Sequence, residues 1–340
     1  MQERLPVPAD LPLCFVLPEG SELVSGGNLY NRAFLEALAA LVPVRRLSLG
    51  EWRRELQAGT PGCFFLDSLD LNQAPELARR RPGQYFGLLV HHLPSLEPGL
   101  PESHPSRRFE AEALTRFDLF VCTSPFTREY LGSRGIPEAR LLTVPPAPPA
   151  ARARARRYEP PLSALMVANL IPRKGVLELL RALSARGEAL EFRLTIVGRD
   201  DIDPDYASAC RAFLAGSPYL APRARIAPAV SQERMLEYYE VNDLVVSAAK
   251  METFGMALQE ARAHGLPLLV QAGGFARAHV DEGSNGLVLG DVTALADALL
   301  SLAREALRMS ALFAGAQATR PGTGYGWRDA ARRFLVGLGR

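Results

Sequence analysis

The sequence predicts an α/β protein with two domains, each built on a mostly parallel sheet. Short apolar runs alternate with segments of helical period, and the alternation occurs in both halves of the chain. A proline-rich and charged stretch near the middle marks the boundary between the halves. With 340 residues, of which 48% are hydrophobic, the chain is long enough for two separate cores.

The first half is expected to contain four strands, at residues 11–16, 63–66, 86–90 and 119–122. Ser25, Gly26 and Gly27 follow the first strand and open a helical pattern. Ser25 can cap this helix, and the two glycines let backbone amides approach a phosphate or a sugar. The alternative is that the glycines serve only the turn.

The second half is expected to contain five strands, at residues 162–168, 192–197, 243–247, 267–270 and 286–289. Between the halves, prolines within 145–149 precede an alternating Ala-Arg run at 151–157, which we interpret as a solvated linker. Contact of this run with an anionic lipid surface is the alternative. We expect domains over 1–150 and 159–322, followed by a segment 323–340 that carries an amphipathic helix.

Two glutamates, Glu252 and Glu260, lie eight residues apart around an expected helix start. If residues 255–264 are helical, the two carboxylates are separated by roughly 12 Å along the axis, which is similar to the length of a nucleotide sugar. One glutamate could then bind hexose hydroxyls and the other ribose hydroxyls, with a diphosphate near the helix N-terminus. The alternative is a surface helix with one acid in its favourable first turn and the other on its solvated face. The position between two expected strands favours the ligand site.

A second motif, from Asn169 to Gly175, follows the strand at 162–168 and contains Arg173 and Lys174. Two cations next to a helix N-terminus oppose the helix dipole unless an anion binds there. The motif therefore predicts a diphosphate site rather than an ordinary basic turn. Lysine occurs in this chain only at Lys174 and Lys250, next to the two motifs, which suggests that a compact ammonium is needed there.

The run from Ser247 to Val288 resembles the signature of retaining glycosyltransferases of the GT-B fold, family 4, also called group 1. The matching pieces are Ser247, Glu252-Thr253-Phe254-Gly255, Glu260, Gly273-Gly274 and Asn285-Gly286-Leu287-Val288. The resemblance implies two Rossmann-like domains that face a cleft, with the acceptor side in the first domain and the nucleotide-sugar donor site in the second. It also implies a terminal helix that crosses back to the first domain.

The resemblance further implies the roles of individual residues. Arg173 and Lys174 would stabilise the leaving diphosphate, Glu252 would hold the donor sugar and Glu260 its ribose. His91, which follows the strand at 86–90, would face the sugar and completes the implied catalytic set. The implied donor-binding residues are Gly26, Gly27, Asn169, Gly175, Thr253, Phe254, Gly255, Met256 and Glu260.

Two further residues of the first half have alternative readings. His92 is the alternative to His91 as the histidine that faces the ligand. Ser124 follows the strand at 119–122, where the family commonly has a serine that contacts phosphate or acceptor, but it can equally be a helix cap. For either histidine, a structural role is the competing interpretation.

The sequence also departs from the family pattern. The acidic residue that usually follows the glycine pair is missing, since Arg277 and His279 precede the first acid, Asp281. Arg277 would suit a charged or differently oriented donor. The segment 225–231 lacks a glycine common near the base-binding loop, so the sequence does not predict the base.

The function expected from the resemblance is transfer of a hexose, with retention, from a UDP- or GDP-type sugar to an acceptor hydroxyl. The nucleotide sugar is the only co-substrate expected, with no metal and no further cofactor. The acceptor, whether glycan, lipid, protein or small metabolite, is not predicted. The alternatives are a noncatalytic nucleotide-sugar-binding relative, an epimerase and a phosphorylase of the same architecture.

Bulk properties narrow the class of protein. A net charge of +2 and a pI near 8.4 give no reason to expect nucleic-acid binding. The four cysteines have no metal or redox spacing, so we expect reduced thiols. No segment approaches about 18 consecutive apolar residues, and no secretory pattern is present. We expect a cytoplasmic protein, with peripheral contact at the inner face of an anionic membrane as an alternative.

Overall fold

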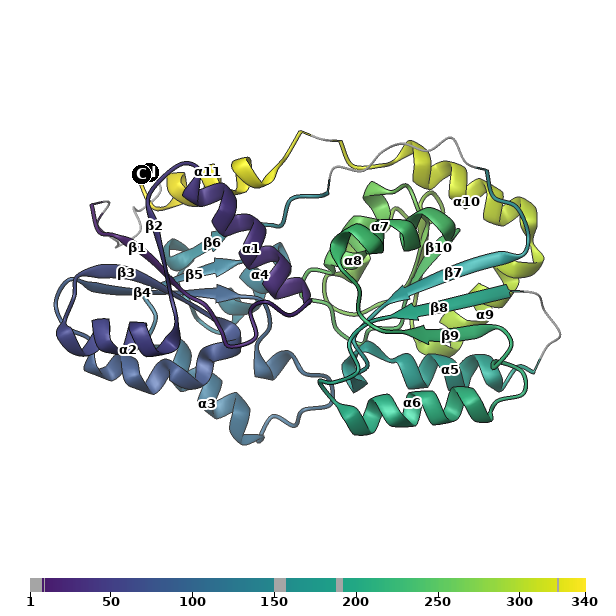
Figure 1. Ribbon diagram of the computed structural model, residues 1–340, viewed down its shortest axis with the longest axis horizontal. Coiled ribbons are helices and arrows are strands. Elements are labelled where there is room, and N and C mark those ends of the chain that lie inside the picture. The colour runs from purple at the N-terminus through teal and green to yellow at the C-terminus, as the bar shows by residue number, and fades with distance from the viewer. Residues whose placement is uncertain (1–7, 9, 150–156, 188–191, 323) are drawn as a thin grey trace. The chain divides into compact units, whose positions relative to one another are not determined.

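A computed structural model describes residues 8, 10–149, 157–187, 192–322 and 324–340. The chain divides into two compact units (Figure 1). The first unit comprises residues 1–147 and 324–340, and the second comprises residues 148–323. Most of the Ala-Arg run, for which a linker or a lipid contact is predicted, lies outside the described residues.

The first unit contains one six-stranded parallel sheet of strand order β2-β1-β3-β4-β5-β6. Its strands are β1 Leu13–Val16, β2 Val44–Leu47, β3 Gly62–Asp67, β4 Gln84–Val90, β5 Leu119–Cys122 and β6 Leu141–Thr143. Its α-helices are α1 Gly26–Ala39, α2 Leu49–Ala58, α3 Pro105–Leu114, α4 Pro125–Ser133 and α11 Trp327–Gly337. The 3₁₀ segments are η1 Ser68–Arg79, η2 Pro94–Leu96 and η3 Glu138–Arg140.

Helix α11 completes the core of the first unit, although the whole second unit precedes it in the sequence. Its Phe334 is fully buried and lies with its ring centroid 5.3 Å from that of Phe34 on α1 and 5.2 Å from that of Phe65 on β3. Trp327 makes an edge contact with Tyr30 of α1 at 5.3 Å. The apolar side of the amphipathic helix therefore packs into an aromatic cluster.

The second unit contains another six-stranded parallel sheet, of order β12-β11-β10-β7-β8-β9. Its strands are β7 Leu162–Val167, β8 Phe192–Val197, β9 Ala224–Ala227, β10 Leu244–Ser247, β11 Leu268–Gln271 and β12 Gly286–Leu289. Its α-helices are α5 Val176–Ser184, α6 Pro204–Gly216, α7 Gln232–Val241, α8 Met256–Ala263, α9 Val292–Arg304 and α10 Ala306–Ala318. The 3₁₀ segments are η4 Pro172–Lys174 and η5 Ala276–His279.

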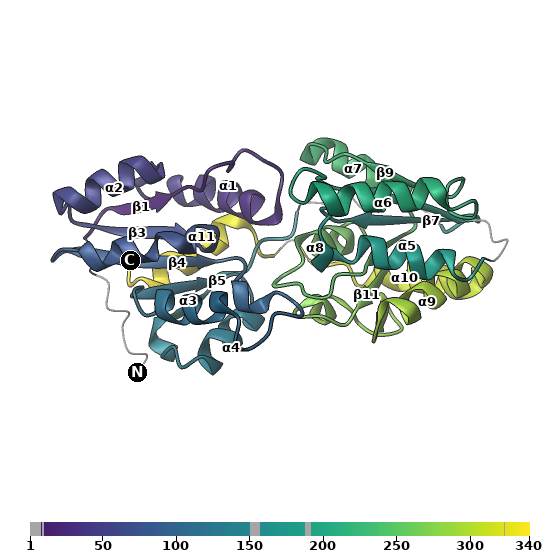
Figure 2. The same cartoon turned by 90° about the horizontal axis from the view of Figure 1, so that it is seen from below.

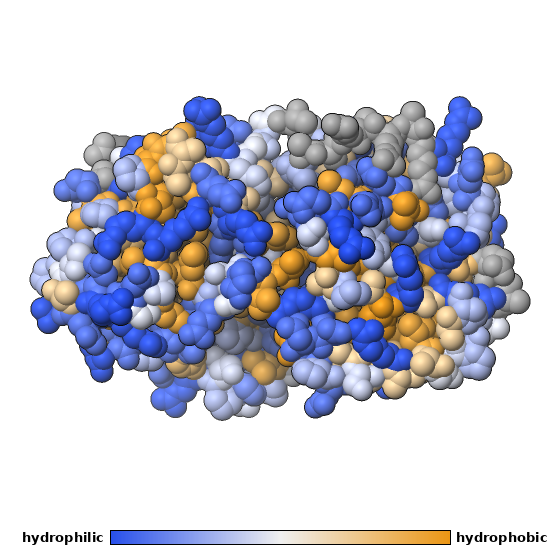
Figure 3. Space-filling view, in the orientation of Figure 1, coloured by the Kyte–Doolittle hydropathy of each residue, from blue (hydrophilic) through white to orange (hydrophobic). Residues whose placement is uncertain are grey.

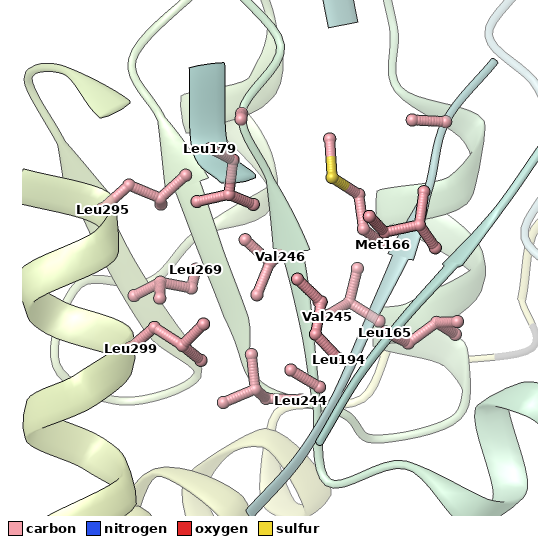
Figure 4. Packing of buried hydrophobic residues seen from close by; sticks show 14 of the residues in the cluster. Leu165, Met166, Leu179, Leu194, Leu244, Val245, Val246, Leu269, Leu295 and Leu299 are labelled. Carbon is pink, nitrogen blue, oxygen red and sulfur yellow. The ribbon is translucent and has the colours of Figure 1, made fainter. Parts of the chain in front are cut away.

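Helices lie on both faces of each sheet (Figures 1 and 2), so the strands are apolar on both sides. In the core of the second unit, Leu165, Val245 and Leu269 come from three adjacent strands (Figure 4). Leu179 of α5 and Leu295 of α9 pack around them. All five side chains are fully buried or nearly so. These cores confirm the predicted α/β class with parallel sheets.

The surface shows no single large apolar area on the face in Figure 3, where apolar side chains are interspersed with hydrophilic ones. The most exposed large apolar residues are Leu307, Val336 and Val241, on three different helices. Scattered exposed apolar residues of this kind are normal. The four cysteines are buried and unpaired. No helix in the described part of the chain has the length and apolar character needed to cross a membrane.

Candidate functional site

The two charged motifs of the sequence meet at one edge of the second sheet. Strands β7 and β10 are neighbours, and the segments that follow their carboxyl ends contact each other. The amide of Lys250 donates to the carbonyl of Arg173 at 2.9 Å, and Arg173 Nη1 donates to the carbonyl of Met251 at 3.0 Å. Strand order reverses between β7 and β10, and such a switch point is where open α/β sheets bind ligands.

An ion pair lies at the centre of this edge. Lys174 Nζ is 2.5 Å from Glu252 Oε1, and the two side chains are 18% and 12% exposed. The cation predicted to bind diphosphate and the carboxylate predicted to bind sugar are thus in direct contact. Each neutralises the other, and both stay within reach of solvent. An ammonium has three donors, so Lys174 can bind an anion and keep this partner.

Gly175 allows the two segments to come this close. Its φ of +67° lies in the left-handed region, and a Cβ at this position would stand 2.3 Å from the carbonyl oxygen of Ala248. Any side chain would therefore push the Arg173-Lys174 turn away from the end of β10. The need for glycine at this position is a packing requirement.

The loop that carries Glu252 is fixed by the loop that carries the glycine pair. The amide of Phe275 donates to the carbonyl of Glu252 at 2.7 Å, and the amide of Glu252 donates to that of Gly273 at 3.3 Å. His279 Nε2 lies 2.7 Å from the carbonyl of Phe254, so this nitrogen carries the hydrogen. His279 is 4% exposed, and burial lowers its pKa to about 4. A neutral histidine therefore holds the Glu252 loop at neutral pH.

Helix α8 begins directly after this loop. Its N-cap, Gly255, has a φ of +89° and, as a glycine, brings no side chain to cap the first turn. Thr253 lies two residues before this N-cap and Met256 directly after it, and the donor contacts expected of both stay predictions. The observed helix agrees with the expected one to within a residue at each end.

Glu260 lies about one turn further along α8, where it is partly buried. Its Oε2 accepts a hydrogen bond from the hydroxyl of Tyr239 at 2.8 Å. Burial raises the pKa of Glu260, and the tyrosine hydrogen bond opposes this rise. The acid is therefore not part of a solvated face, and the interpretation of a surface helix with this acid on its solvated face is wrong.

Asn169 joins the turns that follow β7 and β8. Its Oδ1 accepts a hydrogen bond from the amide of Arg199 at 3.2 Å, and the amide of Leu170 donates to the carbonyl of Arg199 at 2.8 Å. The side chain of Arg199 pairs with Asp201 at 2.9 Å. Asn169 thus has a structural role at this edge, alongside the donor contact predicted for it.

The candidates of the first unit are held by hydrogen bonds within that unit. His91 Nε2 lies 2.8 Å from Asn31 Oδ1 and 3.4 Å from Asp67 Oδ2, and Asn31 Nδ2 donates to Asp67 at 2.7 Å. Burial lowers the pKa of His91 more than Asp67 raises it. A Cβ on Gly27 would stand 3.3 Å from the His91 ring, so the glycine at this position makes room for the histidine.

His92 and Ser124 have local partners. His92 Nε2 lies 3.3 Å from Glu97 Oε2. Ser124 is fully buried as the N-cap of α4, and its Oγ accepts from the amide of Thr127 at 3.1 Å. Ser124 therefore acts as a helix cap in the structure, which is one of the two roles expected for it.

Sequence analysis did not predict roles for Asn31, Asp67, Tyr239 and His279. Asp67 ends strand β3, so the rule that sites form at carboxyl ends of strands could have suggested it. Tyr239 lies inside α7 and His279 ends the 3₁₀ segment η5, and nothing local in the sequence indicates that either contacts the acid motif.

Comparison with known proteins shows a family likeness over a stretch that includes this edge. Residues 161–305 match the family described as glycosyl transferases group 1. This match lies within the second unit. The chain is similar to a D-inositol 3-phosphate glycosyltransferase of Xylanimonas cellulosilytica, with 31% identity over 199 residues, covering 56% of this chain and 47% of the relative. The corresponding enzyme of Kineococcus radiotolerans is 30% identical over 245 residues, covering 64% and 55%.

The chain spans about half the length of the curated relatives that it matches. Solved structures extend the likeness to the whole fold. Sucrose-phosphate synthase from Thermosynechococcus elongatus superposes with a TM-score of 0.74 at 20% identity, over 95% of this chain and 97% of that one. Anabaena HepE, solved with UDP and glucose, gives a TM-score of 0.73 at 15% identity, over 97% and 99%. These likenesses confirm the predicted GT-B fold.

Proposed function

We propose that the chain is a retaining glycosyltransferase that moves a hexose from a UDP- or GDP-type sugar to an acceptor hydroxyl. The observation that carries this proposal is the contact between Lys174 and Glu252 at the switch point of the second sheet. A cation for the leaving group and an acid for the sugar lie side by side, next to the N-terminus of α8, whose N-cap is a glycine. In a nucleotide diphosphate sugar the anionic diphosphate is likewise directly next to the hydroxyl-bearing sugar.

The leaving diphosphate would be bound by Arg173, Lys174 and the first-turn amides of α8. These groups are already oriented, because Arg173 is tied to the carbonyl of Met251 and Lys174 to Glu252. Stabilising negative charge that grows as the glycosidic bond breaks lowers the barrier more than it strengthens donor binding. In this scheme the fixed cations serve the role that a metal ion has elsewhere, so transfer is metal-independent.

When Lys174 contacts the diphosphate, its ammonium divides its hydrogen bonds between the diphosphate and Glu252. The Glu252 carboxylate can then accept hydrogen bonds from sugar hydroxyls. Glu260 would accept hydrogen bonds from the ribose. The acceptor attacks from the face that the diphosphate leaves, and a departing phosphate oxygen takes its proton, so no separate base is required. This route retains the configuration at the anomeric carbon.

The choice of donor is supported by the HepE structures, which were solved with UDP, with UDP and glucose, and with UDP-glucose. The names of the sequence relatives suggest D-inositol 3-phosphate as the first acceptor to try. The match with these relatives is partial, so neutral sugar and lipid-linked acceptors belong in the same screen.

The test compares the two lysines of the chain. Wild type, Lys174→Ala and Lys250→Ala are titrated with UDP, GDP and ADP in a thermal-shift assay, where a ligand at a hundred times its Kd stabilises by about 2.7 kcal/mol. Lys250 Nζ pairs with Glu178 at 2.7 Å and is not assigned to the donor site. We expect one nucleotide to stabilise wild type and Lys250→Ala, and to stabilise Lys174→Ala far less.

A second assay measures transfer from the sugar of the nucleotide that binds. Loss of one preorganised charge-stabilising group typically lowers kcat by about 10²- to 10³-fold, and we expect such a loss for Lys174→Ala. Glu252→Gln should impair transfer more than nucleotide binding. Equal binding and equal turnover in wild type and Lys174→Ala would refute the proposal. Binding without transfer to any acceptor would favour the noncatalytic alternative.

A further inference from the structure

Tyr239 of α7 is buried within the second unit, and its hydroxyl points at Glu260. The side chain is 2% exposed. Its hydroxyl lies 2.8 Å from Glu260 Oε2 and 3.4 Å from the carbonyl of Ala257. A buried hydroxyl needs a hydrogen-bond partner, and a carboxylate is the stronger acceptor of the two. Burial and the neighbouring acid raise the pKa of Tyr239 well above its ordinary value, so the hydroxyl stays protonated and donates.

The phenol ring is itself held in place. The ring of His264, the residue that ends α8, stacks on it with centroids 5.1 Å apart and planes 13° from parallel. Helix α8 therefore contacts Tyr239 at three points along its length: Ala257, Glu260 and His264. Because the ring and the hydroxyl of Tyr239 are both fixed, the hydrogen bond to Glu260 has a single orientation.

A glutamate side chain has three rotatable bonds and loses conformational entropy when it is fixed. The hydrogen bond from Tyr239 fixes the Glu260 side chain before a ligand binds, so this entropy is already lost in the free protein. The hydrogen bond uses one acceptor position of Oε2 and leaves Oε1 and the remaining position of Oε2 for other donors. Glu260 is thereby presented as a preoriented acceptor for a pair of hydroxyls.

We infer that Tyr239 is a positioning residue that orients Glu260 toward the ribose of the donor, so that the Tyr239–Glu260 pair sets the preference for ribonucleotides over 2′-deoxyribonucleotides. This inference rests on the proposed function, since it takes the nucleotide to bind at Glu260. A tyrosine that only joined α7 to α8 would affect the stability of the unit and leave that preference unchanged.

The experiment measures the Kd of UDP and of 2′-deoxy-UDP for the full chain by calorimetry. If GDP or ADP is the nucleotide that binds, its own ribo and 2′-deoxy pair is used. The variants are Tyr239→Phe, which removes the hydroxyl and keeps the ring, and Tyr238→Phe as the matched control. The Tyr238 ring lies under Arg225 at 5.9 Å on the same helix.

In wild type we expect the ribonucleotide to bind about 10- to 100-fold more tightly, since one hydrogen bond to a charged group is at stake. Tyr238→Phe should keep this ratio. Tyr239→Phe should reduce the ratio of the two affinities to a few-fold. The reduction should come mainly from weaker binding of UDP, while 2′-deoxy-UDP binds nearly as before. If Tyr239→Phe does not fold, His264→Leu, which removes the stacked ring and keeps the hydroxyl, should reduce the ratio in part.

Two results would overturn the inference while leaving the proposed function intact. One is nucleotide binding with an unchanged ribose preference in folded Tyr239→Phe, or in His264→Leu where that variant replaces it. The other is a wild type that binds UDP and 2′-deoxy-UDP equally. A wild type that binds no nucleotide at all would instead refute the proposed function.

Discussion

The two sheets have the same number of strands but different orders, and their sites differ with them. In the first unit β1 lies between β2 and β3, whereas in the second β7 lies between β8 and β10, with β9 beyond β8. Candidate residues gather at the switch point in both. The first has a hydrogen-bonded network of His91, Asn31 and Asp67, and the second has the paired charges of Lys174 and Glu252.

This difference shows that the strand order of a parallel sheet determines where a binding site forms but not which ligand it binds. Parallel strands that diverge leave room at their carboxyl ends, and the residues in the following turns decide what binds there. In the second unit these residues suit an anion next to a sugar. In the first unit the role predicted for His91, facing the donor sugar, stays a prediction, and its neighbours in the structure are Asn31 and Asp67.

The largest effect that would separate the two units is on stability. Phe334→Ala removes a fully buried ring from the aromatic cluster of the first unit, and we expect it to cost about 3–5 kcal/mol. Both tryptophans, Trp52 and Trp327, belong to this unit, so their fluorescence reports its unfolding alone. Val336→Ala, on the exposed side of the same helix, is the control and should have little effect. An equal effect of both substitutions would contradict the role of the cluster.

A smaller effect, in the second unit only, should depend on pH. His279 has a pKa of about 4 in the folded protein against an ordinary value of 6.5, so the unfolded chain binds the proton more readily. Its contribution to stability is complete above about pH 6.5 and is lost as the pH falls toward 4. Between pH 7 and 4.5 we expect wild type to lose about 2–3 kcal/mol more than His279→Gln does.

The measurement is denaturant unfolding followed by circular dichroism at the two pH values. Glutamine can still donate to the carbonyl of Phe254 but does not titrate, so the difference between the proteins isolates the histidine. Tryptophan fluorescence, which follows the first unit, should show no such difference. If wild type and variant lose equal stability on acidification, the buried histidine does not carry this dependence.

The smallest expected effect concerns Ser124. Since its hydroxyl caps α4 and is fully buried, Ser124→Ala should destabilise the first unit by about 1 kcal/mol. Nucleotide affinity and transfer should be unchanged. Ser133→Ala, which removes a hydroxyl bonded to the carbonyl of Tyr130 on the exposed end of α4, is the control and should cost less. A loss of transfer in a stable Ser124→Ala protein would restore the predicted contact with phosphate or acceptor.

Much of the fold is predictable because buried parallel strands are continuous apolar runs. Each of the nine strands expected from such runs overlaps an observed strand. The three strands that were not predicted, β2, β6 and β9, lie at the edges of their sheets. An edge strand has one neighbour and tolerates charge, as the two exposed arginines of β2 show, so the apolar signal is weak. Strand β6 is also only three residues long.

The site is predictable to the extent that it is local. The Glu252 and Arg173-Lys174 motifs each follow an expected strand. Their contact depends on β7 and β10 being neighbours in the sheet, and no local sequence pattern predicts this pairing. The links from Tyr239 to Glu260 and from His279 to Phe254 arise where separate segments pack together. Sequence reasoning therefore identified the charged groups and missed the residues that hold them.

The placement of α11 has a consequence for synthesis on the ribosome. The second unit lies within the sequence of the first, so all of its strands are made before Phe334, which the aromatic cluster of the first unit needs. Domains generally fold as units when their residues become available. The second unit can therefore complete its fold first, and the first unit, although its synthesis begins earlier, exposes Phe15, Phe34 and Phe65 until α11 emerges. That interval is when the nascent chain is most exposed to aggregation and most in need of a chaperone.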